Sequence, residues 1–319
     1  MNLSLRASLV ARPLAALGLG VAAMIGAASA ARATDIFSEN PVPVFAGPTD
    51  NPVEDYFLHW FDRVNEAQAT QPHWMTPLAT VTPRLEQEIR YDQSLQQLGN
   101  GADVINFDGG KGLELIPTTM NEILINAPNY EERYVRSPAQ AFGDWNFLTV
   151  KQRIVSEPED KGNYIVSTFL GVQAPMLSSP FTNKAWMITP TLAAGKGFGD
   201  FDIQATVGVP VPLSHESTIG TSLATNVAFQ YHIAQYFWPE VELNDTYWFD
   251  GQRAHLNQLF VTPGIIFGRF KIGQDTPTRP INLIVGVGYQ VAVTPPIKLT
   301  PALTPTFDHG WLMTARMSF

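Results

Sequence analysis

The sequence predicts an all-β protein, an antiparallel transmembrane β-barrel of about twelve strands (ten as the fallback) with a short N-terminal amphipathic helix. Three observations lead to this prediction. Only 15% of the 319 residues are charged, which is low for a soluble domain. Long segments alternate polar and apolar residues, as strands do. The chain also ends on an apolar strand that finishes with Phe319.

The first 33 residues have the composition of an export signal. Arg6 and Arg12 precede an apolar run over 14–28, and small-x-small motifs follow it. We therefore expect residues 1–33 to be a signal peptide cleaved near Ala33. An uncleaved membrane anchor is the alternative, but the run is shorter than the roughly 20 residues that span a bilayer.

The composition excludes several classes of function. The absence of cysteine rules out disulfides, thiolate metal sites and a cysteine nucleophile. The chain carries 29 acidic against 20 basic residues, which argues against nucleic acid as a partner. The six histidines are scattered, and no GxSxG or Walker-type motif is present. We expect no enzymatic activity, no cofactor and no metal.

Residues 34–76 are expected to form an extended leader and one helix. Asn51 has the character of an N-cap, and Pro52 suits the first helical position. One apolar stripe predicts a helix over 52–68, and it consists of Val53, Phe57, Trp60, Phe61 and Val64. The helix could plug a barrel, lie against its periplasmic rim or pack on an ordinary core, and the sequence leaves these three options open.

Residues 77–319 are expected to form the barrel. Alternation with a period of two predicts strands near 84–92, 113–127, 145–155, 164–172, 186–194, 201–209, 221–231, 238–248, 259–270, 281–293 and 311–319. Most are longer than the five or six residues typical of soluble domains, and they suit tilted membrane strands. Since single-chain barrels have an even strand count, one further strand is expected near 75–82 or 130–137.

The polar faces of these strands supply the candidate site. In a barrel such faces point inward, where carboxylates favour cations and basic side chains favour anions. Because both signs are present, the residues could cross-link a narrow interior or contact a solute, and cross-linking is favoured. The expected lumen-facing residues are Arg84, Glu86, Glu88, Arg90, Asp92, Lys151, Arg153, Glu240, Glu242 and Arg316.

The last strand has an apolar face that ends the chain. Trp311, Met313, Met317 and Phe319 share this face. A final amphipathic strand that ends in Phe resembles the C-terminal signal of bacterial outer-membrane barrels. The resemblance implies recognition by the barrel assembly machinery and contact with outer-membrane lipid.

Four runs in the second half resemble a known family. They are Thr191–Asp200, Trp238–Asn244, Val261–Gly264 and Gly286–Gln290. Over roughly residues 185–319 the chain resembles outer-membrane transporters labelled for the MetA pathway of phenol degradation. The resemblance implies passage of a small-molecule solute, hydrophobic or aromatic, by diffusion through the lumen or a lateral opening. A non-conducting structural or adhesion barrel and a soluble periplasmic β-rich binding protein are the alternatives.

A closed barrel should show heat-dependent mobility on a denaturing gel. Unheated protein from isolated outer membranes should migrate differently from boiled protein, because closed barrels resist detergent until heated. Recovery of an unshifted protein in the soluble periplasmic fraction would contradict the barrel.

Overall fold

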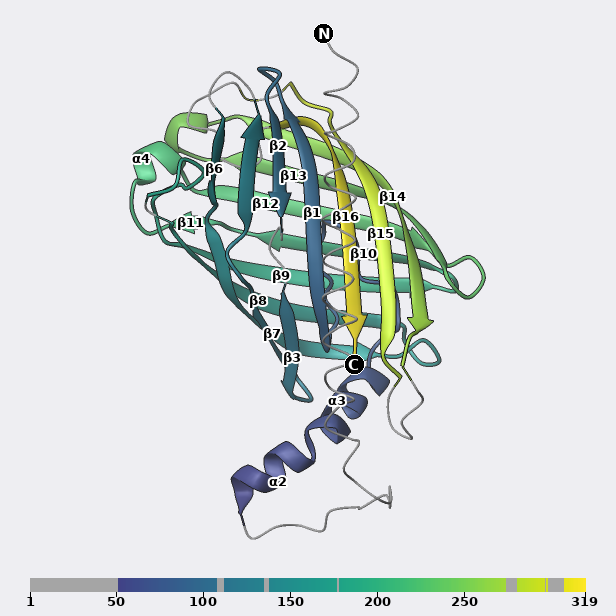
Figure 1. The fold of residues 1–319 in the computed structure, drawn as a ribbon. Helices are drawn as coiled ribbons and strands as arrows, with labels where there is room; N and C mark the ends of the chain where they lie inside the picture. The colour runs from purple at the N-terminus through teal and green to yellow at the C-terminus, as the bar shows by residue number, and fades with distance from the viewer. Residues whose placement is uncertain are drawn as a thin grey trace.

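The computed structural model describes residues 51–107, 112–134, 138–176, 178–273, 280–295, 297 and 307–319. The expected signal peptide (1–33) and the first part of the leader lie outside these residues. The described chain forms one closed antiparallel β-barrel of twelve strands, with the two N-terminal helices at one end (Figure 1). The predicted fold class is therefore confirmed.

The wall follows the chain from strand to strand. Its members are β1 (Glu88–Leu98), β3 (Leu113–Thr118), β4 (Asn121–Ile125), β7 (Trp145–Glu157), β8 (Tyr164–Ala174), β9 (Met187–Phe198), β10 (Phe201–Gly208), β12 (Ser222–Tyr231), β13 (Phe237–Trp248), β14 (Asn257–Lys271), β15 (Asn282–Ala292) and β16 (Phe307–Ser318). The last strand pairs with the first along its whole length, from Glu88↔Ser318 to Leu98↔Phe307. This pairing leaves neither β1 nor β16 with a free edge on that side, as barrel closure requires.

The twelfth strand has a different origin from the one expected. The predicted strand over 113–127 is a hairpin, since β3 and β4 pair with each other across Thr118↔Asn121. Residues 75–82 form no strand, and β5 (Tyr130–Tyr134) lies outside the twelve-strand circuit. The predicted strand over 84–92 begins only at Glu88, so the wall starts later than residue 77.

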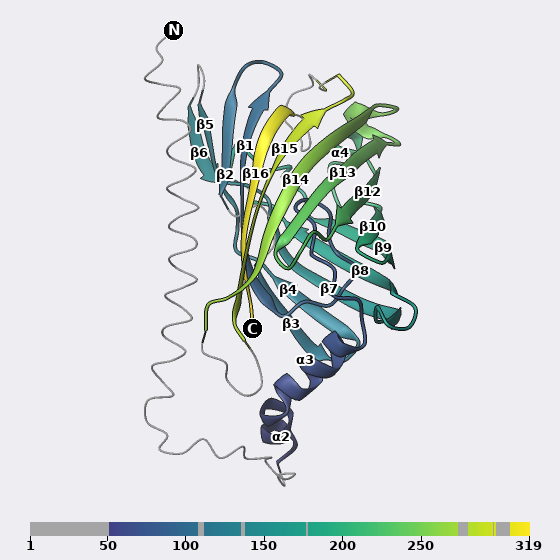
Figure 2. The ribbon, with the colours of Figure 1, turned by 90° about the vertical axis from the view of Figure 1, so that its right-hand side faces the viewer.

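Three short strands branch from the wall at one end of the barrel. Beyond Ile89, β1 leaves β3 and pairs with β2 (Asp103–Phe107), which pairs with β5 and then with β6 (Ala139–Phe142). We call β2, β5 and β6 the side flap (Figures 1 and 2). Among the described residues, β6 pairs with β5 alone. The wall therefore forks at β1.

The predicted helix over 52–68 is two helices, α2 (Pro52–Leu58) and α3 (Trp60–Ala69), which meet at His59. Asn51 caps the first helix, and its side-chain oxygen accepts a hydrogen bond from the amide of Val53 at 3.1 Å. Only part of the apolar stripe is packed: Val64 is buried with Leu85 and Ile116. In the described chain, no helix is long and apolar enough to cross a bilayer.

The outward faces of the strands are apolar. Exposed wall residues include Val150, Ile154, Leu170, Leu192, Val207, Val241 and Leu243. Bulky rings are exposed near strand ends, among them Trp186, Tyr231, Phe249 and Trp311. Such a belt with aromatic rings near its borders suits the hydrocarbon core and interfaces of a membrane.

The apolar face of β16 is only partly exposed. Trp311 is 49% exposed, whereas Met313 and Met317 are buried. Met317 and Ala315 pack against a cluster that includes Ile272 and Ile281, from the connection between β14 and β15. At the end of the chain, the amide of Phe319 donates to the carbonyl of Gln87 at 3.2 Å.

The closure of β1 on β16 can be tested by cross-linking, since the chain has no cysteine. Ser94 and Leu312 are paired across the seam. We expect Ser94→Cys/Leu312→Cys to form a disulfide under mild oxidation, detected as a changed mobility on a non-reducing gel. Ser94→Cys/Ser222→Cys, which joins unpaired strands, should remain reduced. Equal cross-linking of both variants would contradict the seam.

Candidate functional site

An irregular segment occupies the barrel interior. Residues 70–87, here called the luminal segment, leave α3 and run inside the wall before β1 begins (Figure 2). Pro72, Pro77 and Pro83 interrupt it, and proline lacks the amide hydrogen that a strand ladder needs. Most of its side chains are buried. Its backbone groups must therefore find partners on the wall.

Two glutamates of β13 accept the amides at the middle of the luminal segment. Glu240 accepts from the amide of Leu78 at 3.1 Å. Glu242 accepts from Ala79 at 2.7 Å and from Thr80 at 2.6 Å, one with each carboxylate oxygen. Both glutamates are buried, so these hydrogen bonds lie away from bulk water.

Two arginines bind the carbonyls of the same stretch. Arg316 donates to the carbonyls of Thr76 at 2.5 Å and Pro77 at 2.9 Å. Arg90 donates to the carbonyl of Leu78 at 2.6 Å. The wall therefore binds residues 76–80 through both their donors and their acceptors.

A third set of contacts holds the end of the luminal segment. Lys151 donates to the carbonyl of Arg84 at 2.7 Å and lies 2.9 Å from Glu122. Glu122 in turn accepts from the amide of Glu86 at 2.6 Å. Further along the strand that bears Lys151, Arg153 donates to a carbonyl at the end of α3 at 2.8 Å.

The structure places all ten predicted lumen residues in the interior, and all ten are buried. Arg84 and Glu86 belong to the luminal segment, where they form an ion pair at 3.0 Å, and not to a wall strand. On β1, Arg90 pairs with Asp92 at 2.8 Å. The charged wall residues that touch the luminal segment bind its backbone. This arrangement agrees with the expectation that these residues cross-link the interior, and it does not show them lining an open path.

Leu78 sits in a socket made by glycines. A Cβ atom added to Gly264, Gly286 or Gly288 would lie 2.5, 2.7 or 2.8 Å from a methyl group of Leu78. These glycines lie on β14 and β15, in runs where the family resemblance was noted. Their lack of a side chain lets Leu78 approach the wall backbone. Leu78 also packs with Met75, Trp238 and Ile266.

Two cavities lie at opposite ends of the lumen. One, of about 480 Å³, lies at the end where β16 finishes and is lined by residues that include Trp74 and Trp238. The other, of about 170 Å³, is lined by residues that include Trp248 and Arg253. The two sets of lining residues do not overlap. We call them the large and the small cavity.

The inward position of both β13 tryptophans was missed at the level of the sequence. Neither was among the expected lumen-facing residues, yet Trp238 and Trp248 are buried and each lines a cavity. The signal was present, because both share the even parity of Glu240 and Glu242 on one strand.

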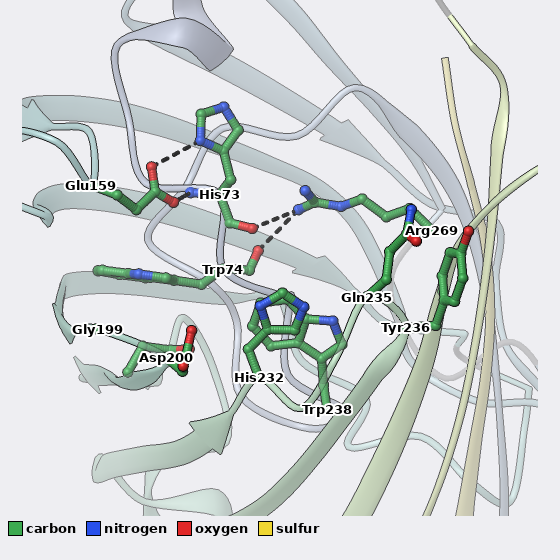
Figure 3. A pocket seen from close by; sticks show the side chains of 12 residues that line it. His73, Trp74, Glu159, Gly199, Asp200, His232, Gln235, Tyr236, Trp238 and Arg269 are labelled. Atoms are coloured by element: carbon green, nitrogen blue, oxygen red, sulfur yellow. Dashed lines mark hydrogen bonds and ion pairs between the residues drawn. The ribbon is translucent and has the colours of Figure 1, made fainter.

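Aromatic rings and charged groups line the large cavity (Figure 3). The ring of His232 stacks on Trp238, with 3.9 Å between centroids and 8° between planes. Trp74 donates through its indole nitrogen to Asn163 at 2.9 Å. Arg269 donates to the carbonyls of His73 at 2.8 Å and Trp74 at 3.2 Å, so it too holds the luminal segment.

His73 and Glu159 join the luminal segment to the turn after β7. The ring nitrogen Nδ1 of His73 lies 3.0 Å from Glu159, and the His73 amide donates to the same carboxylate. Burial by itself would raise the pKa of Glu159, but these hydrogen bonds and the charge of His73 outweigh it and lower the pKa to about 2.

In the described part of the chain, no group of three or more His, Asp or Glu residues is placed to hold a metal. No protein-family model matches the sequence, and no curated protein matches it. The resemblance to the phenol-pathway transporters is therefore not supported by a family match.

The solved structures that resemble the chain weakly include three outer-membrane proteins. An outer membrane channel from Pseudomonas putida F1 is 10% identical, with 72% of this chain and 92% of that one covered and a TM-score of 0.46. OmpF of Salmonella typhi in complex with daunomycin is 8% identical (73% and 96% covered, TM-score 0.34). The trimer form of OmpT, an outer membrane protein of Vibrio cholerae, is 11% identical (73% and 98% covered, TM-score 0.33).

The contact between Leu78 and the glycines predicts that a larger residue at Gly286 is compensated by a smaller residue at position 78. Gly286→Val should destabilise the barrel by about 1–3 kcal/mol, because the new side chain overlaps Leu78. Leu78→Ala in the same chain should recover part of this loss. Urea unfolding in detergent, followed by tryptophan fluorescence, measures both effects. Strictly additive losses would show that Leu78 does not occupy the socket.

The His73–Glu159 contact predicts a pH dependence. Since the folded pKa of Glu159 is below its ordinary value of 4.5, the stabilisation is present above about pH 4.5 and is lost toward pH 2. Glu159→Gln should lower the temperature of the gel-mobility transition at about pH 6, and the difference from wild type should shrink at about pH 2.5. A difference that is constant with pH would contradict this contact.

Proposed function

We propose that the protein is an outer-membrane channel for small, apolar or aromatic molecules, and that the luminal segment closes it. The observation that carries the proposal is a closed barrel with an apolar exterior whose interior is filled by its own residues 70–87. A soluble binding protein would have no use for an apolar outer belt. The belt instead suits contact with outer-membrane lipid.

The contacts of the luminal segment suggest how passage could be controlled. They are hydrogen bonds between wall side chains and the backbone of the segment, without regular pairing. In a lumen that fills with water, the same charges would be hydrated when the segment leaves. The closed and open states would then differ by a modest free energy, which a solute at either cavity could shift.

The side flap offers a lateral route. Because β6 pairs with β5 alone among the described strands, the wall beside it lacks the continuous ladder of β7 to β16. An apolar solute that leaves there would enter the membrane directly. Passage of this kind needs no covalent step and no cofactor.

We also propose an orientation for the barrel in the outer membrane and a partner for its assembly. We place the end where β16 finishes in the periplasm, with α2 and α3, and the side flap toward the outside. The last strand, with Trp311 exposed, would be the part recognised by the barrel assembly machinery. We propose as well that the chain belongs to the phenol-pathway transporter family and that its signal peptide is cleaved near Ala33.

A disulfide that locks the luminal segment tests the proposal. Leu78→Cys/Gly264→Cys places two thiols in the socket of an otherwise cysteine-free chain. Uptake of N-phenylnaphthylamine, an apolar aromatic dye, is followed by fluorescence in cells that express each variant. We expect wild type to accelerate uptake over cells without the protein, the oxidised lock to abolish the gain, and reductant to restore it.

Leu78→Cys alone is the matched control, since it cannot form the disulfide and should respond to neither oxidant nor reductant. If wild type gives no more uptake than cells without the protein, the non-conducting structural barrel is the better interpretation. If the oxidised lock still takes up dye, the luminal segment does not close the path.

A further inference from the structure

We propose that the large cavity binds a small aromatic amine in its ammonium form. If the protein is the channel proposed above, this cavity is a substrate site, and the ammonium ion is the solute that this end of the lumen would accept. It stands on three features of the cavity: flat aromatic walls, a buried carboxylate oxygen without a partner, and an excess of acidic groups.

The aromatic walls come from both the barrel and the luminal segment. His232 and Trp238 form one stacked pair, and Trp74 lines the cavity from the luminal segment (Figure 3). Both tryptophans are buried, so their rings are held in place by packing. Aromatic ligands stack on such surfaces, and an ammonium group is attracted to the face of an indole.

Asp202 supplies the oxygen that the ammonium group would bind. Its side chain points from β10 into the interior, is 0% exposed and lines the cavity. One carboxylate oxygen accepts from Gln204 at 3.0 Å, while Oδ2 is buried with no hydrogen-bond partner. A buried oxygen in this state is costly, and an ammonium group beside it would supply the missing donor. The Nε2 atom of His232 is buried without a partner as well.

The other charged groups favour a cation. Asp200 lies at the exposed rim, and Glu159 is bound to His73. Arg269 is the one Lys or Arg among the described residues that line the cavity, and its Nη2 is bound to the carbonyls of His73 and Trp74. Among the lining residues, three carboxyl groups therefore face one guanidinium, and Arg84, which acts on Asp202 from outside this lining, is itself paired with Glu86 at 3.0 Å. A ligand that carries a carboxylate would meet this acidic excess, whereas an ammonium would balance it.

The volume and position of the cavity fit such a ligand. About 480 Å³ is within the range of small-molecule sites and exceeds what a single substituted ring fills. Because Trp74 belongs to the luminal segment, a bound amine would touch the element that closes the lumen as well as the wall. Binding itself requires no conduction.

Binding of three matched probes to the purified barrel in detergent tests the inference. Benzylammonium chloride, benzyl alcohol and sodium benzoate share one ring and differ in charge, and quenching of tryptophan fluorescence reports occupancy. We expect benzylammonium to bind at least about tenfold more tightly than benzyl alcohol, and benzoate to bind most weakly. Asp202→Asn, which keeps the shape of the side chain, should lose about tenfold in benzylammonium affinity.

Glu216→Gln is the matched control, because it removes one acidic charge from α4 (Glu216–Ile219), away from the residues that line the large cavity, and should leave the affinity unchanged. Heat-dependent gel mobility verifies that each variant is folded. If Asp202→Asn does not fold, Asp200→Asn at the rim takes its place, with a smaller expected loss.

Equal affinity for benzylammonium and benzyl alcohol, or full affinity in the folded aspartate variant, would overturn the inference. Either result would leave the dye-uptake test of the channel intact, because that test uses a different ligand and a different readout. Conversely, selective binding of benzylammonium by a barrel that takes up no dye would retain the site and reject the channel.

Discussion

The arrangement of the whole lumen depends on one constraint: an irregular backbone inside a barrel must have its amides and carbonyls satisfied by the wall. The luminal segment has three prolines and no regular pairing, so its groups cannot satisfy one another. Glu242 binds two consecutive amides, and Arg90 and Arg316 bind the carbonyls just before them. Glu240, Glu242, Arg90, Arg316 and Lys151 all bind this segment, which accounts for their burial, since buried charged groups require hydrogen-bond or ion-pair partners.

The same constraint separates the large cavity from the small one. The stretch 76–80 is bound from several strands, and the glycine socket brings Leu78 against the wall backbone. The large cavity lies at one end and the small cavity at the other, each with a buried tryptophan of β13. In the proposed channel, a solute that enters from the end where β16 finishes would meet an aromatic site before it meets the luminal segment at residues 76–80. Trp74 belongs both to the lining of the large cavity and to the luminal segment, which is the element proposed to block passage.

The predictions from sequence succeeded where a period of two runs through a long strand with one apolar face, as in β7 to β16. The predictions failed where the polar–apolar alternation continues past the end of a strand. Arg84 to Asp92 alternates throughout, yet the first four residues belong to the luminal segment and only Glu88 begins the wall. Alternation likewise hid the hairpin at Thr118↔Asn121, so one predicted strand was really two. Residues in a polar interior and residues in an exposed turn are both polar. Residue type therefore could not distinguish these places from a continuing strand.

The sequence by itself determined the barrel, its even strand number and the inward direction of Glu240, Glu242 and the other charged residues that lie on wall strands, because the pleat fixes the face on which each side chain lies. Only the tertiary structure decided what those side chains touch. The contact between Glu240 and Leu78 joins residues 162 positions apart. Periodicity reports the side of a strand on which a residue lies, but the group across the lumen is set by barrel closure and by the path of a segment without periodicity. The buried, unpartnered oxygen of Asp202 became visible for the same reason, once the space around it was enclosed.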